Sequence, residues 1–178
     1  FIFENILNKY LTYPNIPFFI KRKITAWLEG LKDLQDTFAL KKDEHPSYDQ
    51  LKGLIGKYFG ESETFPASFA IPEQDKPFYV TLAGYLYDYL NKSPKKSEVP
   101  AILYWLSLCE RAVDYNFYYS LADLYLKECI VGEPSSPYAK KCFEEYDDYI
   151  TLMYSGSSGT QIPDYLQDEL KHLKEAVN

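Results

Sequence analysis

The 178-residue chain has few of the residues that build metal sites, disulfide frameworks and membrane spans. It contains three cysteines, none of them in a CxxC pair, and two widely separated histidines, which argues against a zinc site and against a disulfide framework. No apolar run approaches the roughly 20 residues of a membrane-spanning helix, and no signal-peptide pattern is present. We therefore expect no metal, no integral membrane segment and a cytoplasmic protein, although a chain that begins at Phe1 rather than Met leaves the compartment open.

Familiar catalytic motifs are also missing. The sequence has no GxSxG, no HExxH and no glycine-rich phosphate loop. Cys109 or Cys142 with a distant histidine would be a conceivable nucleophilic pair, but both cysteines fall in helices that we expect to pack, where a buried thiol acts as a small hydrophobe. We expect a protein that is not an enzyme and needs no cofactor. An enzyme of unfamiliar type, with convergent ionisable groups in a pocket, is the alternative.

The chain has fewer basic than acidic residues, and it is rich in aromatic residues. A net charge of −7 repels polyanions, so we expect no nucleic-acid partner. Two local charge runs, at residues 21–23 (basic) and 144–148 (acidic), are best explained as solvated helix faces; an anionic membrane surface is the alternative for the first and a cation for the second. The 18 tyrosines favour a recognition surface, because tyrosine combines an apolar ring with a polar tip.

Apolar residues recur every three or four positions, which predicts an all-α protein. We expect antiparallel helical hairpins stacked as a short α-α repeat bundle. Residues 1–60 would form N-terminal helices that pack on the repeats, 61–77 an irregular connection, 78–153 two hairpin repeats and 161–178 a C-terminal capping helix. The expected helices are residues 3–11, 18–40, 48–59, 78–90, 100–113, 117–129, 137–153 and one that begins near Pro163.

The two predicted repeats match when the chain is shifted by 39 residues. The sequence Phe-Tyr-x-x-Leu-Ala occurs at residues 78–83 and again at residues 117–122. In both copies a second alanine follows, with an aromatic residue four positions after it, at Ala101 and Trp105 and at Ala139 and Phe143. Small residues let two helices approach closely while a large ring fills the space beside them, so this pattern predicts paired helices that stack on the next pair.

This pattern resembles the tetratricopeptide superfamily of helical-hairpin repeats. The steps of 18 and 17 residues between paired alanines are longer than a repeat of about 34 residues allows, which is similar to the Sel-one-like branch, although most of that branch's glycines and the closing proline are absent. The residues that stand at the first helix's large, leucine, small and aromatic positions are Tyr79, Leu82, Ala83 and Leu86, then Tyr118, Leu121, Ala122 and Tyr125.

The resemblance implies a concave groove lined by the first helix of each repeat. A peptide segment or a protein face would bind there, so we expect a protein–protein interaction module. A small acidic secretion-type chaperone, or an adaptor subunit of a larger complex, is the alternative, and single aromatic residues of the groove would then pack on neighbouring helices. The candidate partner-binding residues are Val80, Gly84, Tyr87, Asn116, Tyr119, Asp123 and Lys127.

Overall fold

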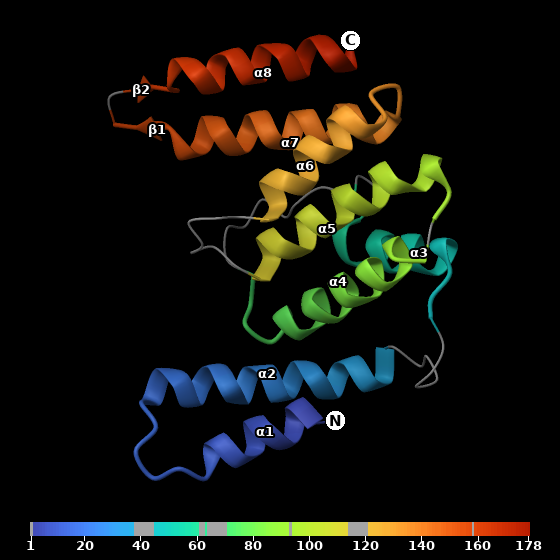
Figure 1. Cartoon of the computed structure of the whole chain (residues 1–178). Helices are drawn as coiled ribbons and strands as arrows, with labels where there is room; N and C mark the ends of the chain where they lie inside the picture. The colour runs from blue at the N-terminus through green and yellow to red at the C-terminus, as the bar shows by residue number, and fades with distance from the viewer. Residues whose placement is uncertain are drawn as a thin grey trace. The chain divides into compact units, whose positions relative to one another are not determined.

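Helices make up nearly all of the regular structure in the computed structural model of the chain (Figure 1). The structure describes residues 2–37, 45–60, 63, 71–92, 94–113, 121–157 and 159–178. The helices are α1 (Ile2–Leu11), α2 (Phe18–Thr37), α3 (Tyr48–Phe59), α4 (Lys76–Leu90), the short 3-10 helix η1 (Lys96–Glu98), α5 (Val99–Val113), α6 (Leu121–Gly132), α7 (Pro137–Met153) and α8 (Asp164–Val177). Strands β1 (Ser155–Gly156) and β2 (Gly159–Thr160) pair antiparallel between α7 and α8. The predicted all-α class is confirmed.

The chain divides into two compact units, Phe1–Tyr85 and Leu86–Asn178, and the division falls inside α4. The sequence had suggested a connection over residues 61–77. Most of that stretch lies outside the described residues, and its last part, from Lys76, already belongs to α4.

Unit 1 begins with a helical hairpin of α1 and α2, which pack on each other. Pro14 and Pro17 lie in the turn between them, where proline disfavours helix in the residue before it. Helix α3 has the bounds that the sequence predicts, because Ser47 and Gln50 form a reciprocal capping box at its start. The Gln50 side chain accepts a hydrogen bond from the Ser47 N–H at 2.8 Å, and the Ser47 hydroxyl accepts one from the Gln50 N–H at 3.4 Å.

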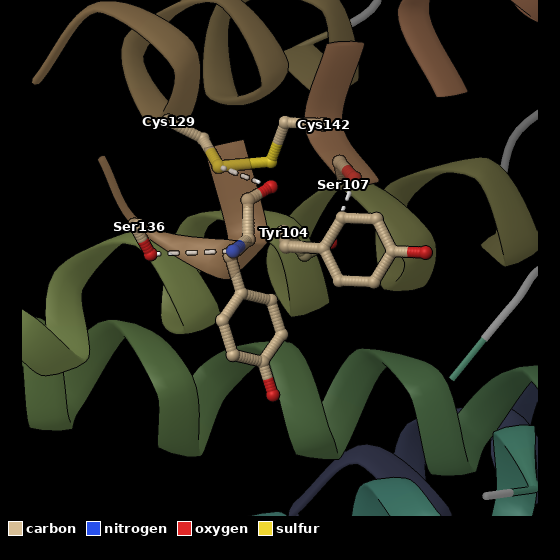
Figure 2. Close-up of a disulfide and its surroundings, with 6 residues drawn as sticks. Tyr104, Ser107, Cys129, Ser136 and Cys142 are labelled. Carbon is tan, nitrogen blue, oxygen red and sulfur yellow. Dashed lines mark hydrogen bonds between the residues drawn. A yellow bond between two sulfur atoms is a disulfide. The ribbon is translucent and has the colours of Figure 1, made fainter. Parts of the chain in front are cut away.

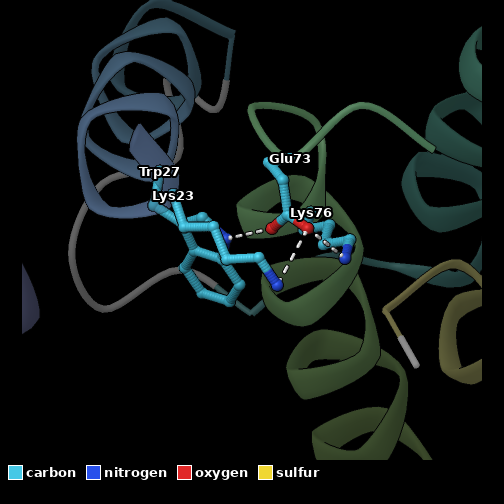
Figure 3. A network of polar contacts seen from close by, with 4 residues as sticks. All are labelled: Lys23, Trp27, Glu73 and Lys76. Carbon is cyan, nitrogen blue, oxygen red and sulfur yellow. Dashed lines mark hydrogen bonds and ion pairs between the residues drawn. The ribbon is translucent and has the colours of Figure 1, made fainter. Parts of the chain in front are cut away.

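Glu73, in the segment before α4, contacts Trp27 and Lys23 of α2 and so connects that segment to the helix (Figure 3). The Trp27 indole donates to Glu73 at 3.1 Å, Lys76 donates at 2.8 Å, and Lys23 forms an ion pair at 3.6 Å. Burial alone would raise the pKa of Glu73, but the hydrogen bonds from Lys76 and Trp27 and the two lysine charges lower it below its ordinary value. Gly30 of α2 also lies close to this segment. A Cβ at this position would lie 1.9 Å from the Gln74 carbonyl oxygen, so there is no space for a side chain.

Helix α5 is the most deeply buried element of unit 2. Every residue from Pro100 to Cys109 is buried, including Trp105, the largest fully buried side chain. A helix that is apolar all round belongs in a core. The Ser107 hydroxyl is satisfied within the helix by donating to the Tyr104 carbonyl at 2.7 Å.

The helices that follow build outward from α5. Helix α6 packs on α5 and α7, and α8 packs on α6 and α7 after the short β1–β2 hairpin (Figure 1). Leu166, Leu170 and Leu173 of α8 are buried, as their spacing on one predicted stripe indicates. Strands β1 and β2 lie in the polar stretch that separates α7 from α8.

A disulfide joins Cys129 of α6 to Cys142 of α7 (Figure 2), so the prediction against a disulfide framework is wrong, and Cys142, expected as a buried thiol, is oxidised. The hairpin of α6 and α7 brings the two Cα atoms to 6.3 Å although the cysteines are 13 residues apart. Ser136 starts α7 close to the end of α6 by accepting a hydrogen bond from the Tyr138 N–H at 3.2 Å. Counting cysteines and looking for CxxC tests for a metal site; it does not detect two cysteines that flank one helix–helix loop. Cys109 is a buried free thiol, as predicted.

Most of the matched positions in the two predicted repeats are buried. Ala83 is only half-buried, and Leu121 is 46% exposed although its counterpart Leu82 is fully buried. The buried positions are Phe78, Tyr79, Leu82, Leu86, Ala101, Trp105, Ala122, Ala139 and Phe143. The start of the second copy, residues 117–120, lies outside the described residues, and the repeat relationship itself stays a prediction.

Candidate partner-binding surface

Helix α6 presents a row of apolar side chains to solvent. Leu121, Leu124 and Val131 are all exposed, and their spacing of three and seven residues places them on one face. The opposite face packs inward with Ala122, Leu126 and other residues that are fully or almost fully buried. We call Leu121, Leu124 and Val131 the α6 outer row. Such a row is informative because large apolar side chains that share an exposed face often mark an interaction site.

A polar cluster lies where α6, α7 and α8 meet. Glu169 of α8 forms an ion pair with Lys127 of α6 and accepts a hydrogen bond from the Tyr146 hydroxyl of α7 at 2.9 Å. The Lys127 ammonium also lies 5.1 Å from the centre of the Tyr146 ring. One carboxylate therefore ties three helices together.

Tyr146 and Lys127 keep their usual protonation states at neutral pH. Burial raises the pKa of Tyr146 to about 12, which keeps its hydroxyl a donor. Burial alone would lower the pKa of Lys127, but the hydrogen bonds to Glu169 and Tyr146 outweigh it and the pKa rises. Lys127 thus stays charged, and the cluster is a stable structural contact at physiological pH.

A second ion pair joins α5 to α7. Arg111 bonds to Glu145, and both side chains are largely shielded from water. Two half-buried residues, Asp123 and Tyr149, lie in the field of Arg111, whose charge lowers the pKa of both, and the Asp123 charge raises the pKa of Tyr149. The Arg111 charge thus extends the cluster from α8 across to α5.

Asp123 is the residue of this cluster whose ionised form is disfavoured by folding. Desolvation raises the pKa of its carboxyl, and the nearby charge of Glu169 adds to this, although Lys127 and Arg111 act in the opposite direction. The ionised carboxylate is therefore less stable in the folded chain than in water. A hydrogen-bond donor or a cation brought by a partner would relieve that penalty.

Only part of the predicted site is brought together here. Asp123 and Lys127 belong to the cluster, and Tyr87 at the end of α4 is half-buried with its ring edge against Tyr125 of α6, 6.0 Å between centroids. Val80 and Gly84 are exposed residues of unit 1, with open space around the Gly84 Cα. The remaining two predicted residues, Asn116 and Tyr119, lie outside the described residues.

Sequence reasoning missed the α6 outer row and the partners of Lys127. Leu121 was assigned to a packing position and Leu124 to none, because the hairpin pattern specifies which residues pack but not which face stays open. Glu169 lies far along the chain from Lys127, and no local pattern connects them. A usable signal did exist for the row: Leu121, Leu124 and Val131 fall between the buried positions of a helix whose inner face is already apolar.

The chemistry available at this surface is recognition of charge and apolar groups. The cluster contains ion pairs and tyrosine hydroxyls, and Cys109, the free thiol of unit 2, is fully buried with its pKa raised by burial. Among the described residues, no three histidine, cysteine or acidic side chains gather to hold a metal ion. Nor does any helix in the described part of the chain have the length and apolar character needed to span a membrane.

Comparison of the chain with protein-family models, with curated proteins and with solved structures finds no match.

Proposed function

We propose that this chain is a non-enzymatic interaction module that binds a peptide segment or a protein face along α6. The observation that carries the proposal is the α6 outer row, whose exposed leucines lie beside Asp123 and Lys127 on the same helix. An apolar strip bordered by charge is the usual composition of a protein interface, with the apolar part at its centre.

The partner chemistry follows from these side chains. Leu121 and Leu124 would contact apolar side chains of the partner. Asp123 would accept hydrogen bonds from a lysine, an arginine or a backbone N–H. Lys127 is already paired with Glu169, so it would lie beside the bound segment without forming a new ion pair with it. A segment with two or three apolar residues and one basic residue fits this description.

The helical-hairpin arrangement of unit 2 supports an origin in tetratricopeptide-like repeats. In such repeats each hairpin stacks on the next, and α6 packs on both α5 and α7. Ala122 and Ala139 are buried on the two helices of one hairpin.

The disulfide favours an oxidising compartment over the cytoplasm that the sequence suggested. Disulfides persist in secreted and periplasmic proteins and are rare where cellular thiols are kept reduced. We therefore propose that the chain meets its partner outside the cytosol or in an oxidising organelle.

The proposal is tested with a random peptide library panned on the immobilised, oxidised chain. Enriched peptides are then measured by fluorescence anisotropy against the wild type, Leu124→Asp and Asp123→Asn. We expect Leu124→Asp to weaken binding by roughly tenfold or more, since a central apolar contact is lost and a charge is introduced. Asp123→Asn should weaken only the peptides that carry a basic residue.

The matched control is Ile6→Asp, which places the same charge on an exposed apolar position of unit 1. It should leave the affinity within about twofold of the wild type, as for most surface substitutions. Peptides whose affinity survives both α6 substitutions would refute the proposed surface. A complex of two chains per partner, measured by sedimentation, would favour the adaptor or chaperone alternative.

A further inference from the structure

Exposed aromatic side chains flank the turn that joins α1 to α2; Figure 1 shows the backbone of this hairpin. Phe18 is 75% and Phe19 62% exposed, although both begin a helix whose next turns are partly buried. Tyr10 and Tyr13, on the other arm of the hairpin, are each 54% exposed, with their rings 5.6 Å apart. We call residues 9–23 the hairpin tip. Exposing four aromatic rings within so short a stretch is costly in water.

The hairpin tip also carries concentrated positive charge. Residues 5–28 contain four basic residues and no acidic one, in a chain whose net charge is −7. Lys9, Lys21 and Arg22 are exposed, and Lys23 is the one that pairs with Glu73. The tip is therefore a basic region of an acidic protein, and its field attracts anions while the rest of the chain repels them.

The side of α2 that is fastened within unit 1 is not the side that carries Phe18. Trp27 and Gly30 contact residues 73–77, and Phe18 is nine residues before Trp27, two and a half helical turns. Phe18 thus lies on the side of α2 opposite Trp27, and Arg22, one turn further along, also lies well away from Trp27. A partner could cover them without disturbing the Glu73 contacts.

We propose that the hairpin tip binds to an anionic lipid surface. The combination of exposed phenylalanine and tyrosine rings with lysine and arginine, and with no acidic residue between them, complements a headgroup layer that is negatively charged outside and apolar beneath. The rings would enter the headgroup boundary while the basic residues contact lipid phosphates and carboxylates. Neither α1 nor α2 is suited to span a bilayer, so the attachment is interfacial. The acidic remainder of the chain makes it weak and reversible.

The test is sedimentation of the full, oxidised chain with vesicles. One set of vesicles contains equal parts of phosphatidylserine and phosphatidylcholine, and the other contains phosphatidylcholine alone. We expect binding to the first set only, with loss of binding at high salt because screening removes the charge term. Equal binding to both sets, or binding to neither, would overturn the proposal.

Variants separate the two contributions. Phe18→Ser with Phe19→Ser should reduce the partition coefficient by roughly tenfold or more, because two large apolar side chains are lost. Lys21→Gln with Arg22→Gln should reduce it by roughly fivefold for each charge removed. All four residues are exposed, and circular dichroism with thermal melting confirms that each variant is folded.

Matched controls come from unit 2. Leu152→Ser with Met153→Ser removes two exposed apolar side chains, and Lys171→Gln with Lys174→Gln removes two exposed charges. Neither should alter vesicle binding. If these controls reduce binding as much as the tip variants do, the assignment to the tip is wrong. A tip variant that changes the chain's self-association in solution without changing vesicle binding would instead identify the tip as a protein interface, and it would also overturn the proposal. Peptide binding at α6 is unaffected by either result, so the two proposals fail independently.

Discussion

The α1–α2 and α6–α7 hairpins have the same helix–turn–helix arrangement, but they differ in how they are stabilised and in what they leave exposed. Each consists of two helices joined by a short connection, and each has an apolar contact between its arms. The α6–α7 hairpin is closed by the Cys129–Cys142 disulfide and tied to α5 and α8 by ion pairs. The α1–α2 hairpin has one fastened side, around Trp27, and leaves four aromatic rings at its turn exposed.

The difference follows from how many neighbours each hairpin packs against. Hairpin α6–α7 shares its inner faces with α5 and α8, so its side chains have partners on several sides, and the α6 outer row is one of its exposed apolar parts. The tip of α1–α2 has partners on few sides. Regions with few packed neighbours open more easily and are those that natural proteins use for reversible contacts. Each prediction below tests one part of this contrast, beginning with the largest expected effect.

Removing the disulfide should affect the α6–α7 hairpin most. Cys129→Ser with Cys142→Ser removes a cross-link over 13 residues, which is expected to cost about 3 kcal/mol of unfolding free energy. Urea denaturation of the variant and of the wild type measures the loss. The reduced wild type should match the variant, and equal stability of the oxidised and reduced protein would contradict this account.

The close approach at Gly30 should make the fastened side of α2 sensitive to a single methyl group. Gly30→Ala places a Cβ 1.9 Å from the Gln74 carbonyl oxygen, so the backbone must shift, at a cost of about 2 kcal/mol. Gly53→Ala in α3 is the matched control. No atom lies within 4 Å of its added Cβ, and it should stabilise the chain by about 0.5 kcal/mol through helix propensity. Denaturation midpoints that shift equally for both variants would rule out the crowding.

Neither of these two effects could be predicted from the sequence. The helices themselves were predictable: the α3 bounds follow from Ser47 and Gln50, and the α5 core follows from its continuous apolar run. Gly30 gave no signal, because the carbonyl that it meets is more than 40 residues away. The disulfide and the Lys127–Glu169 pair depend equally on which helices face each other. Local patterns determine elements, whereas facing pairs depend on the tertiary arrangement.

The two half-buried carboxyls should respond to pH in opposite directions. The pKa of Glu73 is lowered from 4.5 in the folded chain, so its ionised form stabilises unit 1 above that pH, and the gain disappears as the pH falls through the lowered value. Glu73→Gln should therefore destabilise the chain at pH 7, by less than about 1 kcal/mol since solvent screens part of the interaction. At pH values below the lowered pKa the variant and the wild type should have the same unfolding free energy. A difference that persists there would indicate a packing effect.

Asp123 should give the smallest effect and the opposite sign. Its pKa is raised from 3.8 on folding, so the ionised carboxyl costs stability at neutral pH, and the cost is absent below 3.8. Asp123→Asn should then stabilise the chain at pH 7, by a few tenths of a kcal/mol for a half-buried group. The gain should vanish in acid. A variant that is more stable yet binds basic peptides less well would explain why such a carboxyl is kept on the partner-binding surface.

The disulfide also changes what a protease can do to this protein. The loop between α6 and α7, residues 133–136, can be cut without entering a helix. A cut there would leave Cys129 and Cys142 on different fragments that stay covalently attached. The nicked chain would run as one species on a non-reducing gel and as two after reduction, and it would keep α6 and α7 side by side. The α1–α2 hairpin has no such bond, so a cut in its turn would free α1 to dissociate.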